Sequence, residues 1–398
     1  MPGFTLLKNA PTTRSTTLAS LAAAVVSVPL LLTGCTDNTK AAGDSSGPIE
    51  VVSSNTGCKV SAAKVPSGNL TFTVKNEGTE VTEFYLLAAD GLRILGEVEN
   101  IGPGLTRNLV VTAPAGTYTT ACKPGMEGDG IRGALEVTQS GNEPTADANF
   151  QHLLDTATGQ YASYVKDQGE QLLTGTQQFA AAFAAGDAEQ ARQLYAATRQ
   201  HWERIEPVAE SFGDLDPQLD AREADLEPGQ EWTGWHRAEK DLFPPAGYTA
   251  MTPAERTAIA DRMVADTKEL VERSRTLEFS ADTLGNGAKG LLDEVATRKV
   301  TGEEEIRSHT DLWDFQANID GARIAFESLK PALLQKDPAL AASLDEKFAA
   351  LQAELATHSQ GGGFTYYDKL SPEQVQRLAS LVDALGEPLS RLSAAVVL

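Results

Sequence analysis

Positive charge is scarce in this 398-residue sequence, which has 33 lysines and arginines against 55 aspartates and glutamates. The formal net charge of -22 repels nucleic acid and anionic lipid surfaces, which argues against proteins that bind either. The same charge attracts cations. It is also typical of a secreted protein that stays soluble through its acidity, so the positions of the acids have to distinguish the two interpretations.

Long apolar stretches are lacking beyond the N-terminus, which argues against a spanning helix there. Near the N-terminus, two basic residues precede an apolar stretch over 18–32 that ends in Leu32-Thr33-Gly34-Cys35. This string resembles a bacterial lipobox, although an ordinary N-terminal helix is the alternative. We expect residues 1–34 to be a lipoprotein signal peptide and Cys35 to carry lipid, which would anchor the protein outside the cell membrane, at the cell surface or in the periplasm.

Cysteine is nearly absent: the chain has three, and lipidation of Cys35 would leave Cys58 and Cys122. In an oxidising compartment such a pair usually forms a disulfide, which would stabilise the fold by about 4 kcal/mol through loop closure. As thiolates the two residues would instead bind a metal. The residues alone leave both alternatives open.

Residue composition and pattern divide the chain into an N-terminal β region and a C-terminal helical region. Residues 35–48 are small and polar, typical of a flexible tether, and 140–149 have the character of a linker. Residues 49–139 contain short β-branched segments separated by Gly and Pro turns, which predicts a β-sandwich. Residues 150–398 are rich in Ala, Leu, Glu and Gln, which predicts an all-α bundle. The expected helices cover 160–185, 188–212, 234–242, 253–279, 303–329, 338–357 and 372–394.

Motifs of common enzyme classes are missing. The chain has no nucleotide-binding glycine motif, no G-x-S-x-G, no C-x-x-C and no H-E-x-x-H. A peptidase of the zincin type needs the last of these, because two imidazoles one turn apart hold its metal. We therefore expect a protein that is not an enzyme.

Carboxylates gather around one histidine in the helical region. His236 and Glu239 are three residues apart, so a helix would place them on one face, where they could hold one metal ion; a surface ion pair is the blander interpretation. Glu203, Glu206 and Glu210 would stack on another helix face, where their repulsion calls for a cation or for solvent.

The intervening segment 212–222 adds three acids, among them Asp220. Carboxylates with one imidazole suit iron, manganese or zinc better than a thiophilic ion.

Four strings in residues 150–398 give the helical region a resemblance to a known family. They are HWERIEPVAESFGDLD at 201–216, DAR at 220–222, TGWHRAE at 233–239 and GEEEIRSHTDLWDFQANIDG at 302–321. The region resembles the imelysin-like domain of the EfeO/EfeM iron-uptake proteins. This resemblance implies a bundle of two related halves.

The resemblance also implies a metal site, formed by His236 and Glu239 first, then by Glu203, Glu206 and Asp220. Acids and a histidine of the last string either approach the same cavity or only pack the bundle: Glu303, Glu304, His309 and Asp311. The remaining histidines match no motif and are expected to be structural or exposed: His152, His201 and His358.

The β region resembles the cupredoxin-like domain found in longer EfeO proteins. The matching features are Thr56-Gly57-Cys58, the strand over 81–85, and the string from Cys122 to Met126. The implied metal site consists of Cys58, Glu83, Cys122 and Met126, with Glu127 and Asp129 as lower-ranked neighbours. Because residues 49–139 contain no histidine, a blue-copper centre is not expected.

Together, the resemblances imply a metal-binding lipoprotein of an iron-uptake system. It would capture iron, with copper and zinc as further candidate ions, and deliver it to a membrane iron permease. An exported haem peroxidase is the other implied partner, and nucleic acid is not one. The alternatives are a protein that binds acidic polysaccharide or another polymer, a copper-handling protein, and, if the β region holds copper, a ferroxidase.

Overall fold

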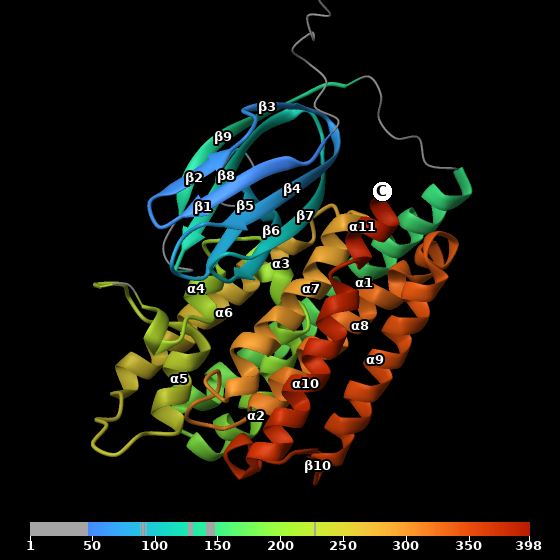
Figure 1. The fold of residues 1–398 in the computed structure, drawn as a ribbon. Coiled ribbons are helices and arrows are strands. Elements are labelled where there is room, and N and C mark those ends of the chain that lie inside the picture. Colours follow the sequence, from blue (N-terminus) through green and yellow to red (C-terminus); the bar gives the residue numbers. More distant parts are fainter. Residues whose placement is uncertain are drawn as a thin grey trace, which may run out of the picture. The chain divides into compact units, whose positions relative to one another are not determined.

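The computed structural model describes residues 47–87, 89, 91, 94–125, 130–140, 148–226 and 228–398. Several predicted features lie outside the described residues: the signal peptide, Cys35, Met126, Glu127 and Asp129. Within them, a region of β-strands is followed by a helical region, as the sequence predicts (Figure 1).

The strands of the β region that the structure describes form a four-stranded and a five-stranded sheet. The first has the order β2 (Gly57–Val60), β1 (Ile49–Ser54), β4 (Gly68–Asn76) and β7 (Thr106–Ala113). The second has the order β3 (Lys64–Pro66), β9 (Ile131–Thr138), β8 (Gly116–Pro124), β5 (Thr82–Leu87) and β6 (Ile94–Ile101). Most neighbours are antiparallel, but β1 pairs with β4, and β3 with β9, in parallel.

One apolar core joins these sheets. Side chains on β1 alternate, so that Ile49 and Val51 are buried and Glu50 is exposed. Across the core, the ring of Phe72 on β4 lies 5.2 Å from the ring of Phe84 on β5. Fully burying one such ring contributes roughly 1.5–3 kcal/mol, which explains why β-branched and aromatic residues dominate these segments.

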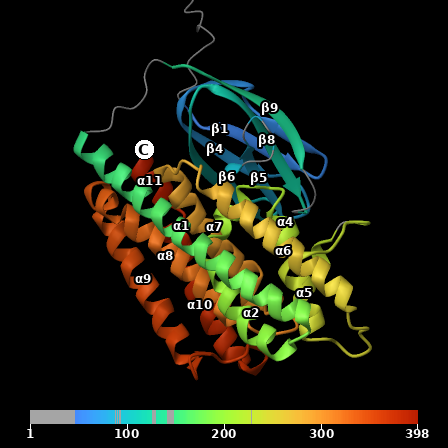
Figure 2. The same cartoon turned by 180° about the vertical axis from the view of Figure 1, so that it is seen from behind.

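Long helices make up most of the second region (Figure 2). They are α1 (Ala148–Ala185), α2 (Ala188–Glu203), α6 (Pro253–Ser274), α7 (Ala281–Thr297), α8 (Asp311–Lys336), α9 (Pro338–Thr357) and α10 (Pro372–Leu389). Shorter helices are α3 (Glu206–Glu210), α4 (Asp216–Leu219), α5 (Gly234–Leu242) and α11 (Leu392–Val397). Single 3-10 turns lie at Glu223–Asp225, Lys299–Thr301 and Tyr367–Lys369.

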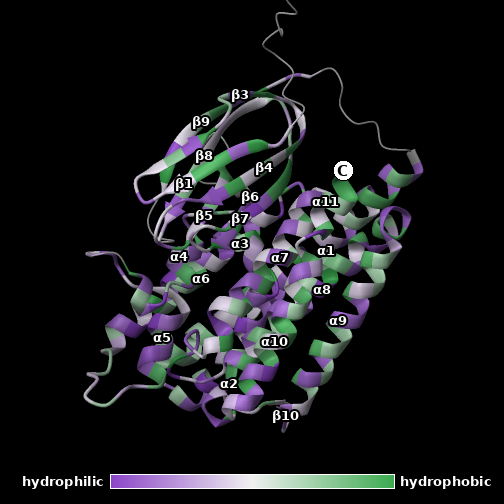
Figure 3. Ribbon diagram, viewed as in Figure 1, coloured by the Kyte–Doolittle hydropathy of each residue, from purple (hydrophilic) through white to green (hydrophobic). Residues whose placement is uncertain are grey.

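Capping and amphipathic patterning explain these helices. Thr252 and Glu255 bond each other's backbone N–H groups at the start of α6, as do Ser371 and Gln374 at α10. Hydrophilic and hydrophobic residues alternate around most helices, and α1 packs against α2, α6 and α8 (Figure 3). In the described part of the chain, no helix has the length and apolar character needed to span a membrane.

The observed helices differ from the expected ones in instructive places. A helix at α7 was not expected, because Gly285, Gly287 and Gly290 weaken the helical pattern. In the fold, a side chain at Gly285 would come within 2.9 Å of the Ser393 backbone, so this glycine allows α11 to approach closely.

The expected helix over 188–212 stops at Glu203. Pro207 has no N–H, and its ring would clash with the carbonyl of Glu203 if the helix continued. The side-chain N–H of Asn318 bonds that carbonyl instead, at 2.9 Å. The expectation of an all-α region also needs correction, because β10 (Ser359–Gln360) and β11 (Gly363–Phe364) pair as a short antiparallel hairpin.

Candidate metal centre

Gly234 sets the position of α5, the helix that carries the central histidine. Its φ of 81° lies in the left-handed region, and a Cβ there would overlap the carbonyl of Leu219 at the end of α4. Only glycine lets the two helices meet so closely. As a result, His236 in the first turn of α5 faces Asp220, the residue that ends α4.

His236 is surrounded by carboxylates on both sides of its ring. Its Nε2 lies 3.5 Å from Oδ1 of Asp220 and 3.4 Å from Oε1 of Glu304. Its Nδ1 lies 3.8 Å from Oε2 of Glu239 and 3.9 Å from Oε1 of Glu305. In each of these two sets of three residues, the possible ligand atoms all lie within 4.8 Å of one another.

Both ring nitrogens of His236 are unsatisfied. The side chain is only 3% exposed, yet neither nitrogen has a hydrogen-bond partner among the described residues. Oε2 of Glu304 is also buried without a hydrogen-bond partner among the described residues. Because a buried polar atom without a partner is unfavourable, these atoms point to a ligand that would complete their bonding.

Two buried cations offset part of the negative charge. The guanidinium of Arg199, fully buried, lies 2.7 Å from Glu305 and 3.4 Å from Asp314, and it also pairs with Asp220 and Glu203. Nζ of Lys299 lies beside Glu203 and Glu206. Five of the carboxylates around these two cations are themselves buried: Glu203, Glu206, Glu304, Glu305 and Asp314. The acids therefore outnumber the cations of the protein, and a further cation would offset part of the excess.

The charges also shift proton affinities. Burial and the charge of Arg199 lower the pKa of His236, but Asp220 and the contacts with Glu239 and Glu304 outweigh them and raise it well above its usual value. Burial, reinforced by the charge of Glu239, raises the pKa of Glu305 to about 8. Without a metal ion, the centre therefore holds protons near neutral pH, and a cation would have to displace them.

The structure brings together three of the sequence-predicted ligands, His236, Glu239 and Asp220. It places Glu203 and Glu206 differently, since both lie outside the two sets of three. Nζ of Lys299 lies 3.1 Å from Glu203 and 3.3 Å from Glu206, and the amide of Asn318 donates to both carboxylates. These two acids are thus positioned to hold buried cations of the protein itself.

Sequence reasoning left out Glu305 and did not rank Glu304 among the first ligands. The expected helix over 303–329 would have turned consecutive acids to different faces. Instead, these residues form a turn before α8, and the N–H groups of Arg307 and Ser308 donate to Glu239 at 2.9 and 2.7 Å. The sequence signal that could have identified Glu304 and Glu305 was the run of three glutamates over 303–305.

The other candidate residues of the string over 302–321, and the histidines that match no motif, take structural or peripheral positions. Asp311 accepts the N–H of Glu305 at 3.1 Å, and Glu303 is exposed. Nδ1 of His201 lies 2.9 Å from Oε1 of Gln168, and His152 is exposed.

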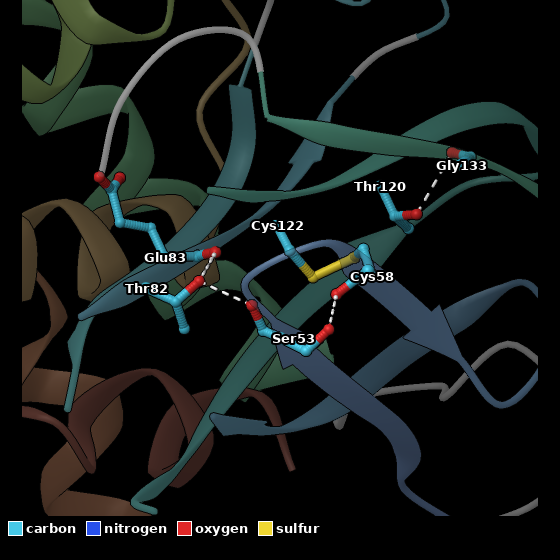
Figure 4. Close-up of a disulfide and its surroundings, with 9 residues drawn as sticks. Ser53, Cys58, Thr82, Glu83, Thr120, Cys122 and Gly133 are labelled. Atoms are coloured by element: carbon cyan, nitrogen blue, oxygen red, sulfur yellow. Dashed lines mark hydrogen bonds between the residues drawn. A yellow bond between two sulfur atoms is a disulfide. The ribbon is translucent and has the colours of Figure 1, made fainter. Parts of the chain in front are cut away.

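In the β region, Cys58 and Cys122 are joined as a disulfide (Figure 4). This corrects the expectation that the two residues bind metal as thiolates, because bonded sulfurs carry no thiolate charge. Glu83 points away from the disulfide, and its carboxylate accepts a hydrogen bond from the hydroxyl of Tyr85. Successive strand residues face opposite ways, so Phe84 faces the core with Cys122 and Glu83 does not.

Comparison with known proteins agrees with this two-part organisation. The family model for imelysin matches residues 157–392, and that for a cupredoxin-like domain matches residues 22–137. The chain is 36% identical over 347 residues to the iron uptake system component EfeO of Escherichia coli O1:K1, covering 86% of this chain and 90% of the relative. The EfeO of Shigella flexneri is 35% identical with the same coverage. A crystal structure of a protein from Parabacteroides distasonis matches with a TM-score of 0.47 and 16% identity, covering 65% of this chain and 97% of that one.

Proposed function

This chain belongs to the EfeO/EfeM family, and from that premise we propose that it is an extracytoplasmic component of an iron-uptake system whose helical region binds the iron. The iron is cargo, and its candidate ligands form two sets that share His236: Asp220 with Glu304, and Glu239 with Glu305.

The unsatisfied imidazole of His236 carries this proposal. A buried histidine normally bonds at least one ring nitrogen to a protein group or to water. Here both nitrogens face carboxylates at 3.4–3.9 Å, beyond hydrogen-bonding distance for most pairs. A cation beside Nε2 would contact Asp220 and Glu304. A cation beside Nδ1 would contact Glu239 and Glu305, so the spacing on either side of the ring is favourable for metal binding.

The donor chemistry favours iron among the candidate cargo ions. One imidazole with several carboxylate oxygens suits iron, manganese and zinc, whereas copper(I) prefers sulfur. The fit to iron is supported further by the names of the relatives, which are iron uptake system components.

The remaining parts of the system are proposed on the same premise. Lipid on Cys35 would keep the protein at the outer face of the membrane, and residues 35–48 would tether the folded body near its partners. The β region over 49–139 and the helical region over 150–398 would act together. A membrane permease would receive the iron, and an exported haem peroxidase would act in the same system.

The experiment is a titration of iron(II), iron(III), copper(II) and zinc(II) into the mature protein, with bound metal measured by elemental analysis. Removing the central imidazole in His236→Gln should weaken iron binding by about a hundredfold, and removing a charged ligand in Glu304→Gln by about tenfold or more. The matched controls are His152→Gln and Glu303→Gln, which change exposed side chains of the same types. They should bind iron as the unmodified protein does.

Unchanged iron affinity in a folded His236→Gln variant would overturn the site. Tighter binding of copper than of iron would move the function to copper handling. Retention of acidic polysaccharide after complete metal removal would favour the polymer-binding alternative.

A further inference from the structure

A second group of acids lies apart from His236. Carboxylate oxygens of Glu97, Glu99 and Glu210 all lie within 4.8 Å of one another. Glu97 and Glu99 are two residues apart on β6, so their side chains share one face of the strand, and Glu210 is the last residue of α3. The fold therefore brings three carboxyl groups together from distant parts of the sequence.

Glu99 provides the second observation, because it is buried without a partner. Its side chain is 8% exposed, and no hydrogen bond or ion pair joins it to another residue within the ranges that the structure describes, although the charge of Arg298 acts on it. A buried carboxyl group of this kind either keeps its proton or needs a cation beside it. Burial, with the charges of Glu97 and Glu83, raises the pKa of Glu99 well above its usual value, so an entering cation would displace a proton.

The nearby cations of the protein are engaged elsewhere. Nε of Arg298 lies 3.3 Å from Glu294, and Nζ of Lys123 lies 4.4 Å from the centre of the Tyr85 ring. The cluster thus differs from the surroundings of His236, where Arg199 and Lys299 are bonded directly to the acids.

A cavity connects the two strand glutamates with solvent. Glu97 and Glu99 line a cavity of about 910 Å³, whose other walls include Asn286 and Asp293 on α7. An ion in this cavity would reach the two strand carboxylates from solvent.

We propose that Glu97, Glu99 and Glu210 form a second cation site, separate from the iron centre, which takes a hard cation of the manganese(II) and calcium class. All three candidate ligands are carboxylates, and oxygen-only sites suit such ions, whereas copper and zinc favour nitrogen or sulfur donors. The ion would link β6 to α3 and take the place of the proton on Glu99. The site does not depend on the proposed iron function.

The test uses the mature protein with His236→Gln, which removes the proposed iron centre. Manganese(II) binding is followed by electron paramagnetic resonance, and calcium(II) is added as a competitor. We expect one manganese ion to bind and calcium to displace it, and we expect Glu99→Gln in this background to weaken binding by tenfold or more. The matched control is Glu50→Gln, an exposed acid on β1, which should leave binding unchanged.

A stability measurement separates ligand loss from misfolding. In chelator, Glu99→Gln should melt no lower than its parent, because a neutral amide replaces a protonated, neutral carboxyl group of similar shape. Manganese should raise the melting temperature of the parent and not that of Glu99→Gln. The proposal is overturned if the parent binds no manganese, or if Glu99→Gln binds it as tightly as the parent.

Discussion

Nζ of Lys299 lies 3.1 Å from Oε2 of Glu203, and neither side chain is exposed to solvent. The same ammonium group lies 3.3 Å from Glu206, so one cation of the protein serves two acids that the sequence pattern offered as metal ligands. The sequence correctly indicated that these acids need a positive partner, although the helix expected to stack them ends at Glu203. The partner is a lysine nearly a hundred residues away in the chain, which no local pattern reveals.

Replacing this lysine should therefore destabilise the protein strongly. Lys299→Met leaves Glu206 without a cation among the described residues and Glu203 with Arg199 alone. The loss of one partner of a buried pair reduces the free energy of unfolding by about 3–5 kcal/mol. Chemical denaturation followed by circular dichroism measures the change. The control is Lys268→Met, because Lys268 and Glu272 form an exposed pair 3.9 Å apart, for which at most about 1 kcal/mol is expected. Equal stability of the two variants would show that Glu203 and Glu206 do not need the ammonium group.

Proton binding gives the metal-free protein an unusual pH dependence. Burial raises the pKa of Glu305 to about 8 and that of Asp311 to about 7. Burial, with the charge of Asp220, raises the pKa of Asp216 to about 7. Between their ordinary values and these raised ones, the folded chain holds protons that the unfolded chain has lost. The free energy of unfolding should therefore fall as pH rises from 5 to 8.

The raised pKa of His236 acts in the same direction, since its contribution is present at low pH and lost as pH rises. We expect a loss of at least about 1 kcal/mol across this range in chelator, measured by denaturant unfolding at each pH. Bound iron should reduce the loss, because a cation takes the place of the protons. A metal-free protein that is more stable at pH 8 than at pH 5 would contradict this reasoning.

The disulfide should stabilise the β region without affecting iron capture. Cys58 and Cys122 are 64 residues apart, and opening a loop of this length should reduce the free energy of unfolding by about 4 kcal/mol. The measurement compares thermal unfolding of the mature protein with that of Cys58→Ala/Cys122→Ala, and iron titration of both provides the control. Thiol titration of the untreated, denatured protein should find neither cysteine reactive. Two reactive thiols would restore the metal-ligand interpretation.

Sequence reasoning succeeded where the information was local. The spacing of His236 and Glu239 on one helix face, and the strand segments around Phe72, needed only periodicity and residue type. Sequence reasoning failed where contacts between distant segments determine the local structure. Nothing near Glu305 indicates that a turn, rather than a helix, presents it to His236, and nothing near Gly285 indicates that α11 packs against it.

The same reasoning makes Gly234 the most informative position for the proposed iron centre. Gly234→Ala adds a methyl group where the carbonyl of Leu219 lies, so α5 must shift and carry His236 away from Asp220. Gly229→Ala is a matched control, because Gly229 also has a positive φ, 91°, but no atom lies within 4 Å of its missing Cβ. Both variants incur the backbone strain of an alanine at positive φ, about 1–2 kcal/mol.

Only Gly234→Ala should also weaken iron binding, by about tenfold or more, since displacements near 1 Å disrupt a preorganised site. Iron titration and thermal unfolding of the two variants separate strain from misplacement. If both bind iron equally well, the close contact between α4 and α5 does not position the histidine, and the donor geometry around His236 must be set by the turn that follows Glu305 instead.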